Sequence, residues 1–146
     1  MTYCQKKIIV CSGYFDPLHA GHVEYLQRSK ELGGTLVVII NNDRQASLKK
    51  GKPFMPASER IKVIRALACV DLAIESIDED RTVCKTLAAI HPHIFTNGGD
   101  QSNDKIPEAE ICNRMGIHLV DGLGDKIQSS STLIENAKNI KNYKNL

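Results

Sequence analysis

The chain has 146 residues, of which 42% are hydrophobic and 25% are charged. This balance is typical of one folded globular domain, and it excludes a fibrous or intrinsically disordered chain. The formal net charge is only +2, which is too small to indicate a nucleic-acid-binding or membrane-surface protein. We therefore expect a single domain over residues 1–146, with neither nucleic acid nor a membrane as its partner.

Cysteine usage and apolar runs indicate the compartment. The cysteines are odd in number, widely spread and never in a CxxC pair, which argues against a disulfide framework and a thiolate zinc site. They are Cys4, Cys11, Cys69, Cys84 and Cys112. The longest apolar run, 36–40, is far too short to span a bilayer, and the N-terminus has no signal-peptide pattern. The sequence therefore predicts reduced thiols in the cytoplasm.

The first predicted elements are a strand over 6–12, a helix over 17–32 and a strand over 35–41. Asp16 is a candidate N-cap for this helix because an aspartate side chain accepts bonds from free N–H groups. Pro17 fits the first turn, where its missing N–H costs nothing. The strand over 35–41 is apolar throughout, as expected for a strand buried on both faces.

Helices and strands continue to alternate after a long polar connection over 42–57. The remaining helices are predicted over 58–70, 78–90, 107–116 and 129–140, and the remaining strands over 72–76, 93–97 and 117–121. This alternation predicts a parallel sheet with helices on both faces, because parallel strands need right-handed crossovers. The expected fold class is α/β, a Rossmann-like doubly wound sandwich with a five-stranded parallel sheet.

Polar stretches that follow four of the predicted strands should meet at one edge of this sheet. They are 13–22, 41–52, 97–104 and 121–132. Ligands of such sheets bind beyond the carboxyl ends of the strands, where the strand order reverses. We therefore expect the functional site to be built from these stretches.

The stretch 12–26, "SGYFDPLHAGHVEYL", contains two histidines three residues apart, His19 and His22. Packing against a core explains one histidine of such a helical pair, but it does not explain the adjacent Gly13 and Asp-Pro. Zinc binding lacks the HExxH glutamate and any further ligand nearby. Phosphate binding fits better, because Gly13 allows a tight turn and a helix N-terminus attracts anions. Gly21 has no side chain, so a nucleotide could lie against the helix beside the two imidazoles.

The block "GYFDPLHAGH" (13–22) resembles the HxGH signature of the nucleotidylyltransferase superfamily, in its cytidylyltransferase-like family. That group includes glycerol-3-phosphate cytidylyltransferase and the nucleotidylyltransferase domain of ADP-heptose synthase. Similar blocks follow in order at 41–43, 50–71, 90–100 and 127–134. The resemblance implies a nucleotidyltransferase in which a substrate phosphate attacks the α-phosphate of a nucleoside triphosphate directly and pyrophosphate is released.

The resemblance also implies roles for individual residues. His19 and His22 would hold the triphosphate and stabilise the charge on the five-coordinate phosphorus, with Lys49 as a third catalytic group. The substrate-binding residues would be Asp16, Lys50 and Arg60. The nucleotide-binding residues would be Gly13, Tyr14, Phe15, Asp16, Gly21, Asn97, Gly98, Asp100, Lys126, Ser129, Ser130, Ser131 and Thr132. Mg²⁺ would arrive with the nucleoside triphosphate, without side-chain ligands of its own.

Several of these residues also have simpler explanations. Lys49 and Lys50 fit a solvated loop, and Arg60 fits the surface of a helix. The serine-rich cluster 129–132 fits an ordinary N-cap, because Ser and Thr favour that position. The stretch "NGGD" (97–100) fits a turn, since paired glycines are common between a strand and a polar loop.

The sequence indicates the superfamily more clearly than it indicates the nucleotide donor and the phosphate acceptor of the reaction. The closing block "DKIQSSST" (125–132) lacks the arginine of the cytidylyltransferase pattern. Lys126 would take its place, but a lysine ammonium does not bind phosphate through the two parallel hydrogen bonds of a guanidinium. "NGGD" (97–100) is nearer to the heptose branch. We expect CTP and a glycerol-3-phosphate-like acceptor, because the resemblance implies that stand-alone single-domain members of this size are commonly cytidylyltransferases. The alternatives are an adenylyltransferase that uses ATP with a heptose-phosphate or FMN acceptor, and a non-catalytic nucleotide-binding module. The family also implies a homodimer.

Overall fold

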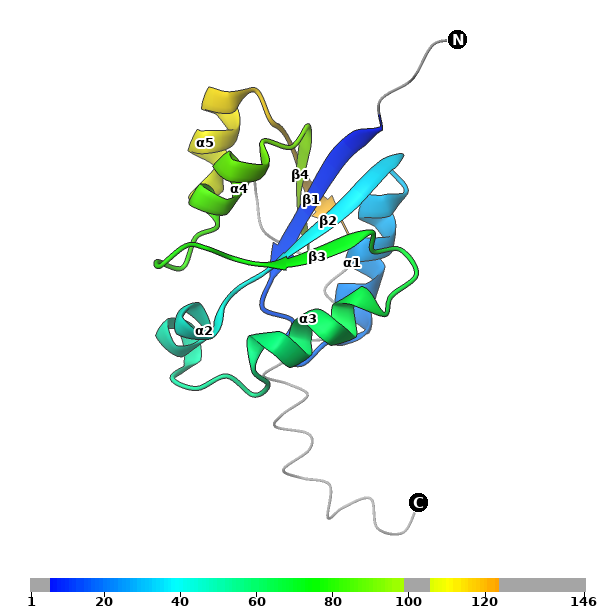
Figure 1. Cartoon of the computed structure of the whole chain (residues 1–146). Coiled ribbons are helices and arrows are strands. Elements are labelled where there is room, and N and C mark those ends of the chain that lie inside the picture. The colour runs from blue at the N-terminus through cyan, green and yellow to red at the C-terminus, as the bar shows by residue number, and fades with distance from the viewer. Residues whose placement is uncertain (1–5, 99–105, 124–146) are drawn as a thin grey trace.

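A computed structural model describes residues 6–98 and 106–123 of the chain (Figure 1). The predicted helix over 129–140 lies outside the described residues. The strands are β1 (Lys7–Gly13), β2 (Gly34–Ile40), β3 (Leu72–Glu75), β4 (Ile94–Gly98) and β5 (His118–Leu123). The helices are α1 (Ala20–Lys30), α2 (Asp43–Lys50), α3 (Ala57–Arg65), α4 (Cys84–Ile90) and α5 (Glu108–Met115). None of these described helices is long and apolar enough to cross a membrane.

The five strands form one parallel sheet in the order β3-β2-β1-β4-β5. Helices α1 and α3 cover one face of the sheet, and α4 and α5 cover the other (Figure 1). The predicted α/β class, a Rossmann-like doubly wound sandwich, is confirmed. The strand order reverses between β1 and β4, so the carboxyl ends of these two strands mark the position where such sheets bind ligands.

Alternating side chains of the central strands fill two cores. Ile9 and Cys11 of β1 pack with α1 and α3, whereas Val10 packs with α4 and α5. Val38 and Ile39 of β2 alternate in the same way. Burying one such aliphatic side chain contributes about 1.5–3 kcal/mol. The central residues of β1 and β2 are continuously apolar because helices cover both faces of the sheet.

Helix α2 lies inside the predicted polar connection over 42–57, where no helix was expected. Its sequence, "DRQASLKK", has no apolar stripe that would indicate a helix. A reciprocal cap begins it instead. The Asn42 side chain accepts from the Gln45 N–H at 2.9 Å, and the Gln45 side chain accepts from the Asn42 N–H at 2.9 Å. This Asn-x-x-Gln spacing follows the capping-box pattern, so a local signal was present.

Helix α4 is shorter than the predicted helix over 78–90. The buried Asp78 carboxylate accepts from the N–H groups of Lys85 and Thr86, at 2.8 and 3.0 Å. These bonds satisfy free donors at the start of α4 from outside the helix. The chain over 78–83 is therefore an irregular connection, and the prediction of a helix there was wrong.

Candidate active site

The two motif histidines lie at the start of α1, which follows the carboxyl end of β1. His19 is the N-cap residue, with extended backbone angles (φ −139°, ψ 174°), and His22 occupies the first turn. Their rings are stacked, with centroids 3.6 Å apart and planes 20° apart. The prediction that the helix begins at Pro17 with Asp16 as its N-cap is wrong, because α1 begins at Ala20.

The hydrogen bond that His22 accepts decides which of its nitrogens carries the proton. The His19 N–H donates to Nδ1 of His22 at 3.2 Å. A neutral imidazole that accepts at Nδ1 carries its proton at Nε2, so we assign an Nε2–H donor to His22. Within the described residues, Nδ1 of His19 is buried without a hydrogen-bond partner, and no acceptor meets the Gly21 N–H. The start of α1 therefore holds several unused polar groups beside a helix N-terminus, which favours anions.

Burial keeps both imidazoles neutral. Burial, with smaller contributions from the charges of His19, Lys49 and Lys50, lowers the pKa of His22 to about 3. Burial also lowers the pKa of His19. At neutral pH the pair therefore acts as hydrogen-bonding groups and not as imidazolium cations.

A neutral, buried His22 predicts a specific dependence of stability on pH. Its folded pKa of about 3 lies below the unfolded value of about 6.5, so only the unfolded chain gains a proton between these values. The stability contribution is complete above about pH 6.5 and is lost progressively as the pH falls toward the folded pKa. Urea denaturation at about pH 7 and about pH 5 should show a larger fall in the free energy of unfolding for the wild type than for His22→Ala. Equal falls in the two proteins would contradict the neutral state.

Phe15 packs against His22 and does not face outward. Its side chain is 2% exposed, and its ring meets the His22 ring edge-on with centroids 5.0 Å apart. A Cβ at Gly13 would lie 2.9 Å from Cζ of Phe15, so Gly13 makes room for this ring. The buried ring therefore supports the histidine pair from within the protein, and a nucleotide contact of Phe15 stays a prediction.

Asp16 holds the segment that follows α2. Its carboxylate is buried and accepts from the N–H groups of Phe54 and Met55, each at 2.7 Å. Nζ of Lys50 donates to the Asp16 carbonyl at 2.8 Å and lies 3.3 Å from the carboxylate. Both carboxylate oxygens therefore accept a backbone hydrogen bond, which gives Asp16 a structural role, and its substrate and nucleotide contacts stay predictions. Lys50 is brought to the site edge, but an internal carboxylate already pairs with its charge.

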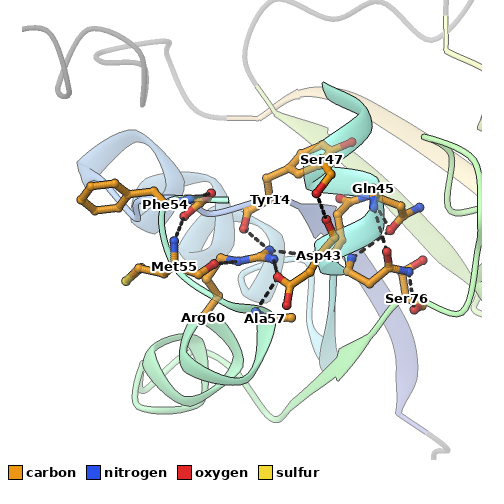
Figure 2. Close-up of polar contacts among 12 residues, drawn as sticks. Tyr14, Asp43, Gln45, Ser47, Phe54, Met55, Ala57, Arg60 and Ser76 are labelled. Carbon is orange, nitrogen blue, oxygen red and sulfur yellow. Dashed lines mark hydrogen bonds and ion pairs between the residues drawn. The ribbon is translucent and has the colours of Figure 1, made fainter. Parts of the chain in front are cut away.

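Arg60 is fully buried at the centre of the network in Figure 2, and its guanidinium is turned to groups of the protein itself. Its guanidinium donates to the Asp43 carboxylate at 2.9 Å. The carbonyls that accept from it are those of Tyr14 at 2.9 Å, Asn41 at 2.7 Å and Met55 at 2.9 Å. These contacts give Arg60 an internal structural role, and substrate binding by Arg60 stays a prediction. Arg60 joins the segments that follow β1 and β2, and so positions the residues around them.

Lys49 reaches the same edge of the sheet from the end of α2. Its Nζ lies 4.4 Å from the centroid of the Tyr14 ring, within cation–π range. Burial, followed by the charges of Lys50 and Arg81, lowers the pKa of Lys49. The contacts of Lys49 and Lys50 confirm that the polar stretches after β1 and β2 meet, as the sequence predicts.

The end of β4 supplies Asn97 and Gly98 to this edge. Asn97 is buried, and its Nδ2 has no hydrogen-bond partner among residues 6–98 and 106–123. A Cβ at Gly98 would lie 3.0 Å from the ring of Tyr25, so a larger residue would press on α1. An unsatisfied buried amide next to a switch point is a candidate ligand contact. The predicted contacts that lie outside the described residues are Asp100, Lys126, Ser129, Ser130, Ser131 and Thr132.

Three residues around the site were not predicted as site residues. Asp43 ends the family-like block 41–43, and Gln45 belongs to the capping box of α2, but neither signal indicated a role in the site. Arg81 is a single arginine in a polar stretch, and such a residue carries no signal of its own. Among the residues that the structure describes, no group of three or more His, Cys, Asp or Glu side chains could hold a metal ion.

The sheet order and the helix start above its switch point define a Rossmann-like α/β domain with lysines gathered at the carboxyl edge of its sheet. A family model described as cytidylyltransferase-like matches residues 10–136. The chain belongs to this cytidylyltransferase-like family, which confirms the resemblance seen in the sequence. Family and relatives together indicate a nucleotidyltransferase.

The relatives agree with this family. Bifunctional protein HldE of Streptomyces coelicolor is 42% identical over 113 residues, which cover 75% of this chain and 24% of that protein. Bifunctional protein HldE of Helicobacter pylori is 34% identical over 139 residues, covering 94% and 29%. The chain therefore spans about a quarter of the length of these curated relatives. A lipopolysaccharide core biosynthesis protein from Thermoplasma volcanium has a similar solved structure, with a TM-score of 0.70 and 31% identity over 82% of this chain and 98% of that one.

Proposed function

We propose that the chain is an adenylyltransferase that transfers AMP from ATP to a sugar phosphate of the heptose-phosphate type and releases pyrophosphate. This donor replaces the CTP expected from the sequence. The curated relatives are HldE proteins, and the solved relative is described as a lipopolysaccharide core biosynthesis protein. Both descriptions favour a sugar phosphate over glycerol 3-phosphate. The stretch 97–100, which resembles the ADP-heptose synthase branch, favours ATP.

The observation that carries the proposal is the set of unused polar groups at the start of α1. The Nε2–H of His22, the His19 ring and the Gly21 N–H would bind the oxygens of the α- and β-phosphates. An oxygen of the acceptor phosphate would attack the α-phosphorus, forming one P–O bond while the bond to pyrophosphate breaks. The protein would contribute positioning and stabilisation of the developing charge, without a covalent intermediate.

Neutral histidines suit this reaction because the attacking group needs no general base. A phosphate monoester has a second pKa near about 6, so the acceptor oxygen is already ionised at neutral pH. His19 and His22 can therefore serve as donors and need not exchange protons. This role is consistent with their burial and their lowered pKa values.

Mg²⁺ is the cofactor that the family implies, and the described side chains do not fit a Mg²⁺ site held by the protein alone. No cluster of three or more potential ligands is present in the described part of the chain. The nearby Asp16 carboxylate is already engaged by two backbone N–H groups. Triphosphate oxygens and water would then supply most ligands, as is usual for Mg²⁺, and we assign no step to it.

Lys49→Ala should weaken binding of the triphosphate more than Lys50→Ala. Lys49 makes no ion pair within the described residues, whereas Lys50 is paired with Asp16. A charge-assisted hydrogen bond contributes about 1.5–3 kcal/mol, which corresponds to about tenfold or more in Kd. Calorimetry with a non-hydrolysable ATP analogue measures both variants. Unchanged binding in Lys49→Ala would assign this lysine to solvated surface.

Pyrophosphate release tests the donor and the acceptor together. ATP, CTP, GTP and UTP would each be offered with glycerol 3-phosphate, FMN and a set of sugar phosphates that includes heptose phosphates. We expect the highest kcat/KM for ATP with a heptose phosphate. A preference for CTP with glycerol 3-phosphate would reinstate the cytidylyltransferase expectation. Nucleotide binding without release in any combination would support the non-catalytic module.

A further inference from the structure

Arg81 lies on the connection between β3 and α4, which runs beside α2 (Figure 1). The Gln45 side-chain amide ties this connection to α2 by donating to the carbonyls of Asp80 at 2.6 Å and Thr82 at 2.7 Å. These two residues flank Arg81 in the chain. Gln45 itself is fully buried, so the anchor lies inside the protein. The backbone at Arg81 is therefore held next to the helix that carries Lys49.

Two carboxylates near Arg81, those of Asp80 and Glu108, accept hydrogen bonds from other groups of the protein. Asp80 accepts from the N–H and the hydroxyl of Thr82, at 2.9 and 2.7 Å. Glu108 accepts from the Val83 N–H at 3.0 Å. Neither carboxylate forms an ion pair with Arg81 within the residues that the structure describes. The positive charge of Arg81 is thus not neutralised by these neighbours.

Arg81 and Lys49 converge on Tyr14. Burial raises the pKa of the Tyr14 hydroxyl, and the positive charge of Arg81 opposes this shift. Within the described residues the hydroxyl is buried without a hydrogen-bond partner. Lys49 lies over the ring of the same tyrosine at 4.4 Å. Two cations near one aromatic side chain repel each other when neither forms an ion pair with a carboxylate, and within the described residues neither Lys49 nor Arg81 forms one. A bound anion would offset this repulsion.

We propose that Arg81 binds the phosphate group of the acceptor, an inference that rests on the proposed function. In the order β3-β2-β1-β4-β5, the histidine pair follows β1 and Asn97 ends β4, on the donor side. Arg81 follows β3, on the other side of β1, which leaves this side for the acceptor. A guanidinium binds phosphate through two parallel hydrogen bonds, and this geometry would orient the attacking oxygen.

Calorimetry with inorganic phosphate, on the full chain saturated with α,β-methylene-ATP, tests the inference. Arg81→Ala should weaken phosphate binding by about tenfold or more, the scale of one charge-assisted contact. Its affinity for the ATP analogue should be unchanged. Arg81→Lys should recover only part of the loss, because lysine keeps the charge but not the fork. The matched control is Arg114→Ala, which removes the same charge from the far end of α5, at the opposite edge of the sheet.

The outcomes separate the inference from the proposed function. Equal phosphate binding in Arg81→Ala and Arg114→Ala, or no phosphate binding by the wild type, would overturn the role of Arg81. A loss of analogue affinity in Arg81→Ala would also overturn it, because Arg81 would then bind the triphosphate. Failure of the proposed function would show instead as a wild type that binds no ATP analogue. Phosphate titration without the analogue would still decide the role of Arg81 in that case.

Discussion

His22→Ala is expected to lower kcat by about a hundredfold or more while the chain stays folded, the scale of losing one transition-state donor. Nδ1 of His22 is committed to the His19 N–H, so Nε2–H is the group left for the phosphates. His19→Ala should have a similar effect, because its ring stacks on His22 at 3.6 Å. Initial rates of pyrophosphate release measure kcat, and circular dichroism reports on folding.

Two further histidine variants separate the donor from the packing. His22→Asn can keep an acceptor near the position of Nδ1 but removes the Nε2 donor, so it should be as inactive as His22→Ala. His118→Ala changes an exposed residue at the amino end of β5, far from the site edge, and should leave kcat unchanged. Near-normal turnover in both His19→Ala and His22→Ala would contradict the assignment of this site.

Arg60→Met should lower the free energy of unfolding by about 3–5 kcal/mol, the range for breaking a buried, hydrogen-bonded charge network. The substitution keeps an unbranched chain but leaves three backbone carbonyls without their donor. The Asp43 carboxylate also loses its guanidinium partner. Urea denaturation measures this loss.

Arg65→Ala is the matched control for Arg60, since both residues belong to α3. Arg65 is exposed and, in the part of the chain that the structure describes, donates to the Ala73 carbonyl alone, at 3.1 Å. Its loss should therefore cost less than about 1 kcal/mol. A similarly small loss for Arg60→Met, together with a raised KM for the acceptor, would restore the substrate contact predicted from the sequence. A large loss of stability would support its role as an internal anchor.

The sheet could be predicted from the sequence because strands that are buried on both faces have continuously apolar sequences. Residues such as Val38 and Ile39 face opposite cores, so the strands show no polar alternation and read as parallel. The polar stretches after these strands then had to lie at one edge. The histidine pair was found for the same reason, since its position in the chain follows a strand and begins a helix.

The internal polar contacts could not be predicted because each depends on residues far apart in sequence. Asp16 looks like an N-cap until its carboxylate is seen to accept from Phe54 and Met55. Arg60 looks like a surface residue at the start of a helix, and only the folded loops bring Tyr14 to it. The spacing of apolar residues indicates which positions of a helix or strand are buried. It does not indicate which distant backbone groups form hydrogen bonds with a buried charged side chain.

The most direct test is the product formed from ATP and a heptose phosphate by the wild type and by His22→Ala. Mass spectrometry should detect an ADP-linked sugar with the wild type, formed in step with pyrophosphate. His22→Ala should form it about a hundredfold more slowly, as expected for a lost donor. An ADP-linked sugar formed equally fast by both proteins would contradict the role of the histidine pair. The absence of any nucleotide-linked product from the wild type, with every donor and acceptor offered, would contradict nucleotidyl transfer itself.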